Sequence, residues 1–218
     1  MEHNTLQGVI FDLDGTLLDS TRMWRQIDGR LMAHYGKEVP PDLSEKVQRM
    51  SIEEFSCFFV EEFDLPVTPE QIARQVADMV AEEYQEKLQL KPHVLELLGW
   101  LDEHGIGYGV ATATYGELAE AALRRLRVWE RLQFLLTEQD AGAPKTQPKI
   151  FQLGAQKLHL GRRQIAVAED SLHALESAKA GGFFTVGVAD AENAAVWKEI
   201  CATATVHVHD ILEMKQFF

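Results

Sequence analysis

The sequence predicts an α/β fold in which a three-layer core, a parallel sheet between two layers of helices, carries an inserted all-helical domain. Three observations predict it. Short apolar runs alternate with helical patterns along most of the chain, the alternation stops between residues 18 and 87, and pairs of carboxylates follow two of the apolar runs. The chain has 218 residues, 46% of them hydrophobic and 25% charged, a composition that supports a packed globular core.

Six short runs rich in β-branched and aromatic residues predict the strands of the core. The first run, GVIFDL at Gly8–Leu13, ends at an Asp-Gly turn signal. The others are Gly107–Thr112, Gln133–Thr137, Gln164–Glu169, Phe183–Ala189 and Thr205–His209. Helical patterns lie between them at Pro92–His104, Glu117–Arg127, Pro148–His159, Leu172–Ala180 and Ala191–Ile200. Strands that alternate with helices of this length imply a parallel sheet covered by helices on both faces.

The segment 18–87 has helical patterns and no convincing strand. A capping box at Ser51–Glu54 and the sequence Thr68-Pro69-Glu70-Gln71 mark two helix starts. Apolar residues then recur at helical spacing, at Ile72, Val76, Met79 and Val80. We therefore predict a core domain of residues 1–17 and 88–218 and a helical cap domain of residues 18–87. An insert after the first strand stands over the usual ligand crevice of an open α/β sheet.

The composition also bears on partners and location. Lys and Arg number 21 and Asp and Glu 34, so the formal net charge is −13. This charge argues against binding to a nucleic-acid polymer or a membrane surface. Cys57 and Cys201 lie far apart and form no CxxC pair, and no run approaches the length of a membrane span. Since the N-terminal residues have no apolar signal core, we expect a cytoplasmic protein.

Two carboxylates, Asp12 and Asp14, follow the first predicted strand. An aspartate at this position can act as a nucleophile toward phosphorus and form an aspartyl-phosphate. The second aspartate can protonate the leaving oxygen and later deprotonate water. The alternative is that the Asp-Gly pair only makes a turn.

A second carboxylate pair, Glu169-Asp170, follows the strand predicted at Gln164–Glu169. Oxygen ligands from two loops at one edge of a sheet suit Mg²⁺, which binds a few carboxylates, waters and a substrate phosphate. The alternative is that Asp170 or Ser171 caps the helix that follows. The two roles are compatible, and the first pair favours a metal site.

Two further residues offer partners for a phosphoryl group. Lys145 lies in a loop before a predicted helix and can reach a phosphate, unless it is simply a solvated lysine. Thr112 ends a predicted strand and can offer its hydroxyl and its backbone N–H, unless it only caps a helix or lies at an edge. Thr114, two residues further on, competes with Thr112 for this role.

Taken in order, these residues resemble the motifs of the haloacid dehalogenase-like (HAD) superfamily, in the subfamily I phosphatase branch with a helical C1 cap. Motif one is Asp12-Leu13-Asp14-Gly15-Thr16, and motif two is Thr112. Motif three is Lys145 in frame with Pro148, and motif four is Glu169-Asp170-Ser171. The resemblance spans nearly the whole chain and implies a Rossmann-like core. Thr146 and Lys149 stand where the family usually has Pro and Asp, and we prefer Lys145 over Lys149 because its distance to Pro148 fits.

The resemblance implies a role for each of these residues. Asp12 is expected to be the nucleophile and a Mg²⁺ ligand, and Asp14 the general acid and base. Further metal contacts are expected from the carbonyl of Asp14, from Asp170, and from Glu169 directly or through water. Lys145 and Thr112, with the neighbouring Leu13 and Ala113, are expected to bind the phosphoryl group. The implied substrate is a small phosphorylated metabolite.

Asp14 distinguishes the reactions of this superfamily, because dehalogenases and phosphonatases lack an aspartate two residues after the nucleophile. A phosphatase is therefore favoured. The alternatives are a sugar phosphomutase of the β-phosphoglucomutase type, which typically has a His where this chain has Trp24, and a non-catalytic metabolite-binding module.

Trp24 lines the pocket or packs in the cap core. Candidates for substrate contacts on the first cap helix are Arg22, Arg25, Arg30 and His34. The sequence does not predict the oligomeric state.

Overall fold

The computed structural model describes residues 6–47, 50 and 52–218, without the side chains of Trp24, Arg25, Ser44, Glu45, Ile52 and Glu53. The chain divides into two compact units. The core unit runs to Ser20 and resumes from Leu88 to Phe218, and the helical unit is Thr21–Lys87. The sequence analysis places the first boundary at Leu18, whereas the helical unit begins at Thr21.

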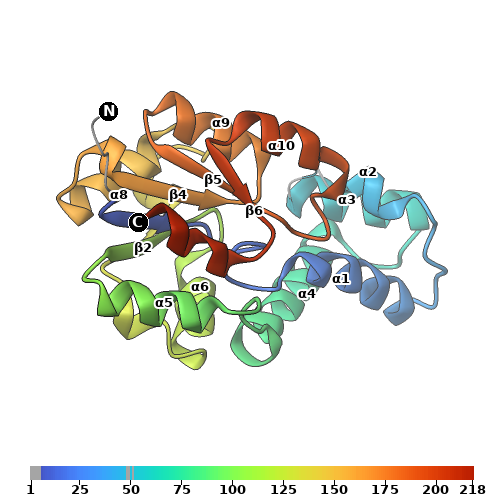
Figure 1. Cartoon of the computed structure of the whole chain (residues 1–218). Coiled ribbons are helices and arrows are strands. Elements are labelled where there is room, and N and C mark those ends of the chain that lie inside the picture. Colours follow the sequence, from blue (N-terminus) through green and yellow to red (C-terminus); the bar gives the residue numbers. More distant parts are fainter. Residues whose placement is uncertain (1–5, 48–49, 51) are drawn as a thin grey trace. The chain divides into compact units, whose positions relative to one another are not determined.

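The described part of the core unit forms a six-stranded sheet in which all neighbouring strands are parallel (Figure 1), which confirms the predicted fold class. The strand order is β3-β2-β1-β4-β5-β6. The strands are β1 (Gly8–Phe11), β2 (Gly107–Thr112), β3 (Leu135–Thr137), β4 (Ile165–Glu169), β5 (Phe184–Val188) and β6 (Val206–Val208). Each lies within the run that predicts it. The central strand β1 pairs with both β2 and β4, so the residues that follow these strands lie at one edge of the sheet.

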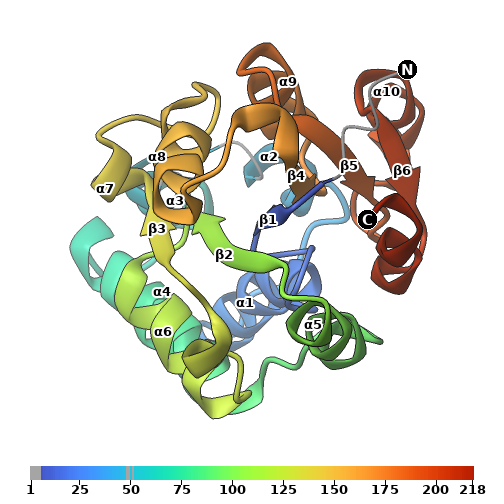
Figure 2. The ribbon, with the colours of Figure 1, turned by 60° about the vertical axis from the view of Figure 1, so that its left-hand side comes forward.

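Helices cover both faces of this sheet (Figure 2). On one face lie α8 (Lys149–Leu158), α9 (Leu172–Ala180) and α10 (Trp197–Thr203). On the other lie α5 (Val94–Glu103) and α6 (Gly116–Arg125), and the short α7 (Glu138–Ala141) follows β3. Four 3₁₀ turns complete the described core unit: Trp129–Arg131, Arg162–Gln164, Ala194–Val196 and Ile211–Phe217.

The core between the sheet and the α8 face is close-packed. Ile10 of β1, Phe151 of α8 and Val167 of β4 belong to one buried apolar cluster. A Cβ atom on Gly154 would lie 2.7 Å from the Cδ1 atom of Ile10, so a glycine lets α8 approach the sheet. The packing fixes the central strands whose ends carry the acidic residues.

The prediction of a helix over Ala191–Ile200 is wrong in its first half, because α10 begins at Trp197 after a 3₁₀ turn. The cause is the buried side chain of Asn193. Its amide nitrogen donates to the carbonyls of Asp170 and Val188, each at 3.0 Å, and its amide oxygen accepts the N–H of Asp190 at 3.1 Å. These bonds hold the chain in a turn where local propensity favours a helix.

The helical unit contains α1 (Thr21–His34), α2 (Leu43–Val47), α3 (Ile52–Phe63), α4 (Pro69–Glu82) and a π-helical turn at Glu83–Lys87. Within its described residues there is no strand, as predicted. The capping box at α4 is confirmed, because the N–H of Thr68 donates to Gln71 Oε1 at 2.9 Å and the N–H of Gln71 to Thr68 Oγ1 at 3.4 Å. The capping box predicted at Ser51 lies outside the described residues. No helix in the described part of either unit is long and apolar enough to cross a membrane.

Charged side chains of the helical unit compensate one another. Arg30 of α1 contacts Glu82 at 2.7 Å and Glu83 at 2.9 Å, and Lys87 contacts the same two carboxylates at 2.8 and 3.1 Å. By contrast, Asp28 of α1 is only 6% exposed, and burial raises the pKa of its carboxyl to about 6.

The chain leaves the core unit and returns to it through paired segments. Leu18 and Leu90 form an antiparallel bridge, flanked by hydrogen bonds from the N–H of Asp19 to the carbonyl of Gln89 at 2.9 Å and from the N–H of Lys91 to that of Leu17 at 2.8 Å. The ammonium of Lys91 then donates to the Gly15 carbonyl at 2.7 Å, the Ala189 carbonyl at 2.9 Å and Asp190 Oδ2 at 2.8 Å. One lysine thus links the returning segment to the loops after β1 and β5.

Candidate active site

The acidic residues predicted as site residues meet where β1 and β4 end. The N–H of Asp12 extends the ladder by donating to the carbonyl of Ala168 at 2.9 Å, which places Asp12 beside the end of β4. Carboxylate oxygens of Asp12, Glu169 and Asp170 lie within 4.8 Å of one another. Asp12 and Glu169 are buried, with 7% and 2% of their surface exposed.

Lys145 provides the positive charge within this cluster. Its Nζ atom lies 2.5 Å from Asp12 Oδ1 and 2.5 Å from Glu169 Oε1, and the residue is 7% exposed. Lys149, the competing lysine of the sequence analysis, is exposed. The loop that carries Lys145 is held by Glu138 of α7, whose Oε1 accepts the N–H of Lys145 at 2.6 Å.

The charges of the cluster do not balance. Burial raises the pKa of Asp12 to about 7, Lys145 opposes this shift, and Glu169 and Asp14 add to it. Burial and the neighbouring Glu169 also raise the pKa of Asp170. Burial alone would lower the pKa of Lys145, but the carboxylates of Asp12 and Glu169 raise it, so the lysine keeps its proton.

These charges and donor atoms fit a divalent cation. The ion pairs found in the described residues give the three carboxylates of the cluster one cation, Lys145. A dication with oxygen ligands would neutralise the remaining charge, and carboxylates from two adjacent loops are ligands that Mg²⁺ accepts. Glu169 has both oxygens occupied, since Oε1 faces Lys145 and Oε2 accepts the N–H of Ser171 at 2.6 Å. Ser171 lies at the N-cap position of α9 but makes no side-chain capping bond.

Asp14, whose charge also acts on Asp12, is contacted by the residues that follow β2. The hydroxyl of Thr114 donates to Asp14 Oδ2 at 2.6 Å, and the N–H of Thr114 donates to Thr112 Oγ1 at 3.0 Å. Thr112 is buried and Ala113 is exposed. The two threonines that compete in the sequence analysis therefore have different partners, because Thr112 organises the turn and Thr114 contacts the acid.

Three residues that sequence reasoning missed support the site through main-chain contacts. Glu138 binds the backbone of Lys145, Asn193 binds the carbonyl of Asp170, and Lys91 binds the carbonyl of Gly15. A signal existed for the first, because Thr137 and Asp140 form a capping box that starts α7. Asn193 and Lys91 contact residues 23 and 76 positions away, and no local pattern predicts such contacts.

The candidates of the helical unit differ in what they contact. Arg30 is engaged by Glu82 and Glu83, so it is not a free cation for a substrate. Arg22 is exposed, and His34 packs edge-on against Tyr35. The side chains of Trp24 and Arg25 lie outside the described part of the structure.

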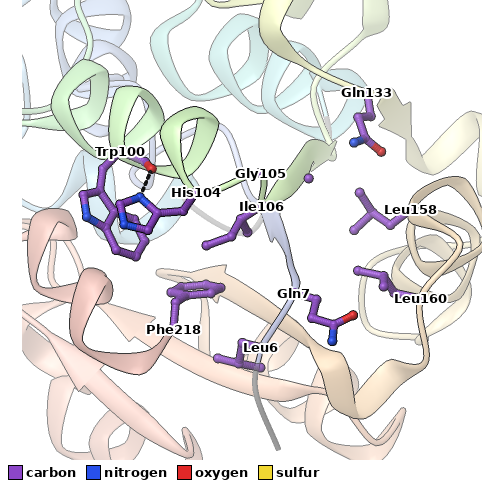
Figure 3. A pocket seen from close by; sticks show the side chains of 11 residues that line it. Leu6, Gln7, Trp100, His104, Gly105, Ile106, Gln133, Leu158, Leu160 and Phe218 are labelled. Atoms are coloured by element: carbon purple, nitrogen blue, oxygen red, sulfur yellow. Dashed lines mark hydrogen bonds between the residues drawn. The ribbon is translucent and has the colours of Figure 1, made fainter.

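A cavity of about 690 Å³ lies at the opposite, amino-terminal edge of the sheet (Figure 3). It is lined by Leu6, Gln7, Trp100, His104, Gly105, Ile106, Gly107, Gln133, Leu158, Leu160 and Phe218. None of the predicted site residues borders it, so the candidate active site is the acidic cluster and not this cavity.

A parallel sheet with paired acids at the ends of its central strands, a buried lysine in contact with them and a helical insert after its first strand defines a class of α/β hydrolases. The chain belongs to the haloacid dehalogenase-like hydrolase family, whose model matches residues 9–188. The resemblance seen in the motifs is thereby confirmed.

Several relatives are named phosphatases of small phosphorylated compounds. A phosphorylated carbohydrates phosphatase of Thermotoga maritima is 26% identical over 81% of this chain and 82% of its own length. A validoxylamine A 7'-phosphate phosphatase of Streptomyces hygroscopicus subsp. limoneus is 26% identical over 94% of both chains. Among solved structures, a candidate β-phosphoglucomutase of Thermotoga maritima matches with a TM-score of 0.86, 25% identity and coverage of 97% of this chain and 99% of its own.

Proposed function

We propose that the protein is a Mg²⁺-dependent phosphatase that hydrolyses a small phosphorylated metabolite through an aspartyl-phosphate on Asp12. The observation that carries this proposal is the position of Asp12, held 2.5 Å from Lys145 beside Glu169 and Asp170 where β1 ends. Relatives named as phosphatases of phosphorylated carbohydrates and of validoxylamine A 7'-phosphate support the reaction and suggest a hydroxylated, sugar-like substrate.

The proposed reaction has two halves. In the first, an oxygen of Asp12 forms a bond to phosphorus, the ester P–O bond breaks, and Asp14 gives its proton to the departing oxygen. In the second, water attacks the phosphorus, Asp14 takes a proton from that water, and the bond between Asp12 and phosphorus breaks to release phosphate. Lys145 and Thr112, with the neighbouring Leu13 and Ala113, hold the phosphoryl oxygens, so positioning and electrostatic stabilisation supply most of the catalysis.

We assign the metal to the same edge of the sheet. The carboxylates of Asp12 and Asp170 and the carbonyl of Asp14 would hold Mg²⁺, with Glu169 acting directly or through water. When bound, the ion neutralises charge on the phosphoryl group and on the carboxylates around it. Lys145 favours the ionised form of Asp12 and, with the ion, would hold this carboxylate toward the phosphorus.

The helical insert, residues 18–87, is proposed to act as a cap that selects the substrate of a core formed by residues 1–17 and 88–218. Limited proteolysis tests this assignment at the two connecting segments, 17–21 and 87–91. Cleavage there is expected to change when a phosphate mimic such as tungstate binds together with Mg²⁺. Equal cleavage in the presence and absence of the mimic would contradict a cap that responds to the site.

Substitution of the nucleophile tests the reaction. Asp12→Asn should lower turnover of p-nitrophenyl phosphate by about 10³-fold or more, the order seen when a covalent nucleophile is removed. Asp19→Asn is the matched control, because Asp19 is an exposed carboxylate in the same connection. Acid-quenched wild-type protein should carry one phosphoryl group on the peptide that contains Asp12. Turnover by Asp12→Asn at the wild-type rate would refute the proposal.

A phosphomutase is the second candidate, because the structural match with a TM-score of 0.86 is described as a candidate β-phosphoglucomutase. The two functions differ in product. With β-glucose 1-phosphate and a catalytic amount of glucose 1,6-bisphosphate, a phosphatase releases inorganic phosphate, whereas a mutase forms glucose 6-phosphate and releases almost none. A wider panel of sugar phosphates, compared by kcat/KM, then identifies the substrate class.

A further inference from the structure

We propose that Thr114 is the positioning residue for Asp14 and holds its carboxyl in place both when it is an acid and when it is a base. The contact that carries this inference joins the ends of two strands, because Thr114 follows β2 and Asp14 follows β1. The two side chains meet at 2.6 Å between Thr114 Oγ1 and Asp14 Oδ2. The inference rests on the proposed function, in which Asp14 transfers the proton.

Thr114 is itself fixed in place. Its N–H donates to the hydroxyl oxygen of Thr112, which is 1% exposed at the end of β2. β2 is in turn paired with β1, with Phe11 opposite Val110. A continuous series of backbone and side-chain hydrogen bonds therefore runs from the centre of the sheet to Asp14. Both Thr114 and Asp14 are half-buried, so the surrounding protein restricts the motion of each side chain.

The chemistry of the partner matches the task of the acid. A hydroxyl can donate a hydrogen bond to a carboxylate and can accept one from a carboxylic acid, whereas an ammonium only donates and a carbonyl only accepts. Asp14 must exist in both forms during one turnover. Thr114 can bind either form without a change of partner, so Asp14 need not move away from the reacting oxygen between the two halves of the reaction.

The site uses a different partner for the nucleophile. Asp12 faces Lys145, an ammonium that favours the ionised carboxylate alone. The carboxylate that must stay ionised is thus paired with a lysine, and the carboxyl that must gain and lose a proton is paired with a hydroxyl. This difference between the two partners assigns Thr114 to proton transfer rather than to binding of the phosphoryl group.

Two esters that differ in their need for an acid test the proposal. The p-nitrophenolate anion leaves without a proton, whereas the alkoxide of glycerol 2-phosphate needs one. The constant kcat/KM reports the steps up to transfer of the phosphoryl group to Asp12. It therefore reports the half of the reaction in which Asp14 acts as an acid. The ratio of kcat/KM for the two esters, measured on one sample, does not depend on how much of that sample is folded.

The variants are Thr114→Val, which keeps the shape of the side chain without the hydroxyl, and Thr114→Ser, which keeps the hydroxyl. Thr114→Val should lower kcat/KM for glycerol 2-phosphate by about 10–100-fold, a part of the 10²–10⁴-fold that general acid catalysis supplies. The value for p-nitrophenyl phosphate should stay within about 3-fold of wild type, and Thr114→Ser should be close to wild type on both esters. Asp14→Asn should show the same selective loss, and a larger one.

Other outcomes would overturn the proposal. An equal loss on both esters in Thr114→Val would assign Thr114 to phosphate binding, and no loss on either ester would remove it from the reaction. A selective loss that Thr114→Ser fails to restore would mean that the methyl group matters and the hydroxyl does not. If wild-type protein hydrolyses neither ester, the proposed phosphatase function fails instead, so the two failures are distinguishable.

Discussion

The core unit and the helical unit carry nearly the same net charge but use it differently. Thr21–Lys87 contains 14 acidic and 8 basic residues, and the rest of the chain 20 and 13, so the net charges are −6 and −7. In the helical unit, Arg30 and Lys87 share Glu82 and Glu83, and the side chains of both cations are more than a third exposed. In the core unit, the side chain of Lys145 is 8% exposed and faces an excess of buried carboxylates.

This difference distinguishes charged residues that only pair with one another from charged residues that form the proposed metal site. Pairs whose cation is exposed to water, such as those of Arg30, cost that cation little desolvation and contribute little stability. A buried cluster with more acids than bases lowers the stability of the empty protein and is favourable only when a cation or ligand supplies the missing charge. The imbalance at the end of β1 therefore supports the metal site proposed there.

The largest effect on stability should come from removing Lys145, the cation of the buried cluster. Lys145→Met leaves the carboxylates of Asp12 and Glu169 buried without a cation and should lower the free energy of unfolding by about 3–5 kcal/mol. Arg30→Met is the matched change in the helical unit and should cost about 1 kcal/mol or less, since Lys87 still pairs with both carboxylates. Urea unfolding in EDTA measures both, and equal losses would contradict the comparison.

A smaller effect should follow from filling the acidic cluster. At a Mg²⁺ concentration of roughly 100 times Kd, binding to the folded state should raise the free energy of unfolding by about 2.7 kcal/mol. Asp170→Asn should lose most of this gain. Glu176→Gln, an exposed change on α9 after the same strand, should keep it. Unfolding curves with and without Mg²⁺ at constant ionic strength provide the measurement, and a gain that persists in Asp170→Asn would place the ion elsewhere.

An effect of similar size, spread over a range of pH, concerns Asp28, a buried acid of the helical unit. Its pKa is raised from 3.8 to about 6 by burial, so between these values the folded state binds more protons than the unfolded state. The contribution of Asp28 to the free energy of unfolding is therefore greatest below about pH 4. About 2–3 kcal/mol of it is lost as the pH rises from there through about 6. Asp28→Asn should remove this dependence and be the more stable protein near neutral pH.

Urea unfolding of wild type and Asp28→Asn from about pH 4 to about pH 7 checks this sign. Asp78→Asn is the control, because Asp78 is an exposed acid of the same unit. If the difference between wild type and Asp28→Asn does not change with pH, Asp28 is not the buried acid that its surroundings indicate.

The sequence was sufficient for the elements of the core that local patterns define. Gly107–Thr112 is predicted with the bounds of β2, because glycine and turn residues flank an apolar run. The π-helical turn at Glu83–Lys87 and the turn at Asn193 were not predicted, because they depend on tertiary contacts. The side chain of Asn193 reaches the carbonyl of Asp170, and no propensity of nearby residues reports such a contact.

The same limit applies to the candidate site. The acidic pairs and Lys145 could be found from motifs, and the structure brings Asp12, Lys145, Glu169 and Asp170 together. The sequence left Thr112 and Thr114 as competitors because both follow one strand and carry the same hydroxyl. Only the register of β2 against β1 shows which hydroxyl reaches Asp14. Similarly, Arg30 could be named as a candidate, but not its pairing with Glu82 and Glu83.

The bridge between Leu18 and Leu90 has a consequence for how this molecule can diversify. Because the chain leaves and re-enters the core at adjacent residues, the sheet closes in the same way whatever lies between them. Lengthening a segment between neighbouring ends costs only about 0.6 kcal/mol for each doubling of its length. Insertions, deletions or exchange of the whole module Thr21–Lys87 are thus cheap at this position. With the cap role proposed for this module, substrate preference can evolve by recombination there while the proposed catalytic residues of the core unit are inherited unchanged.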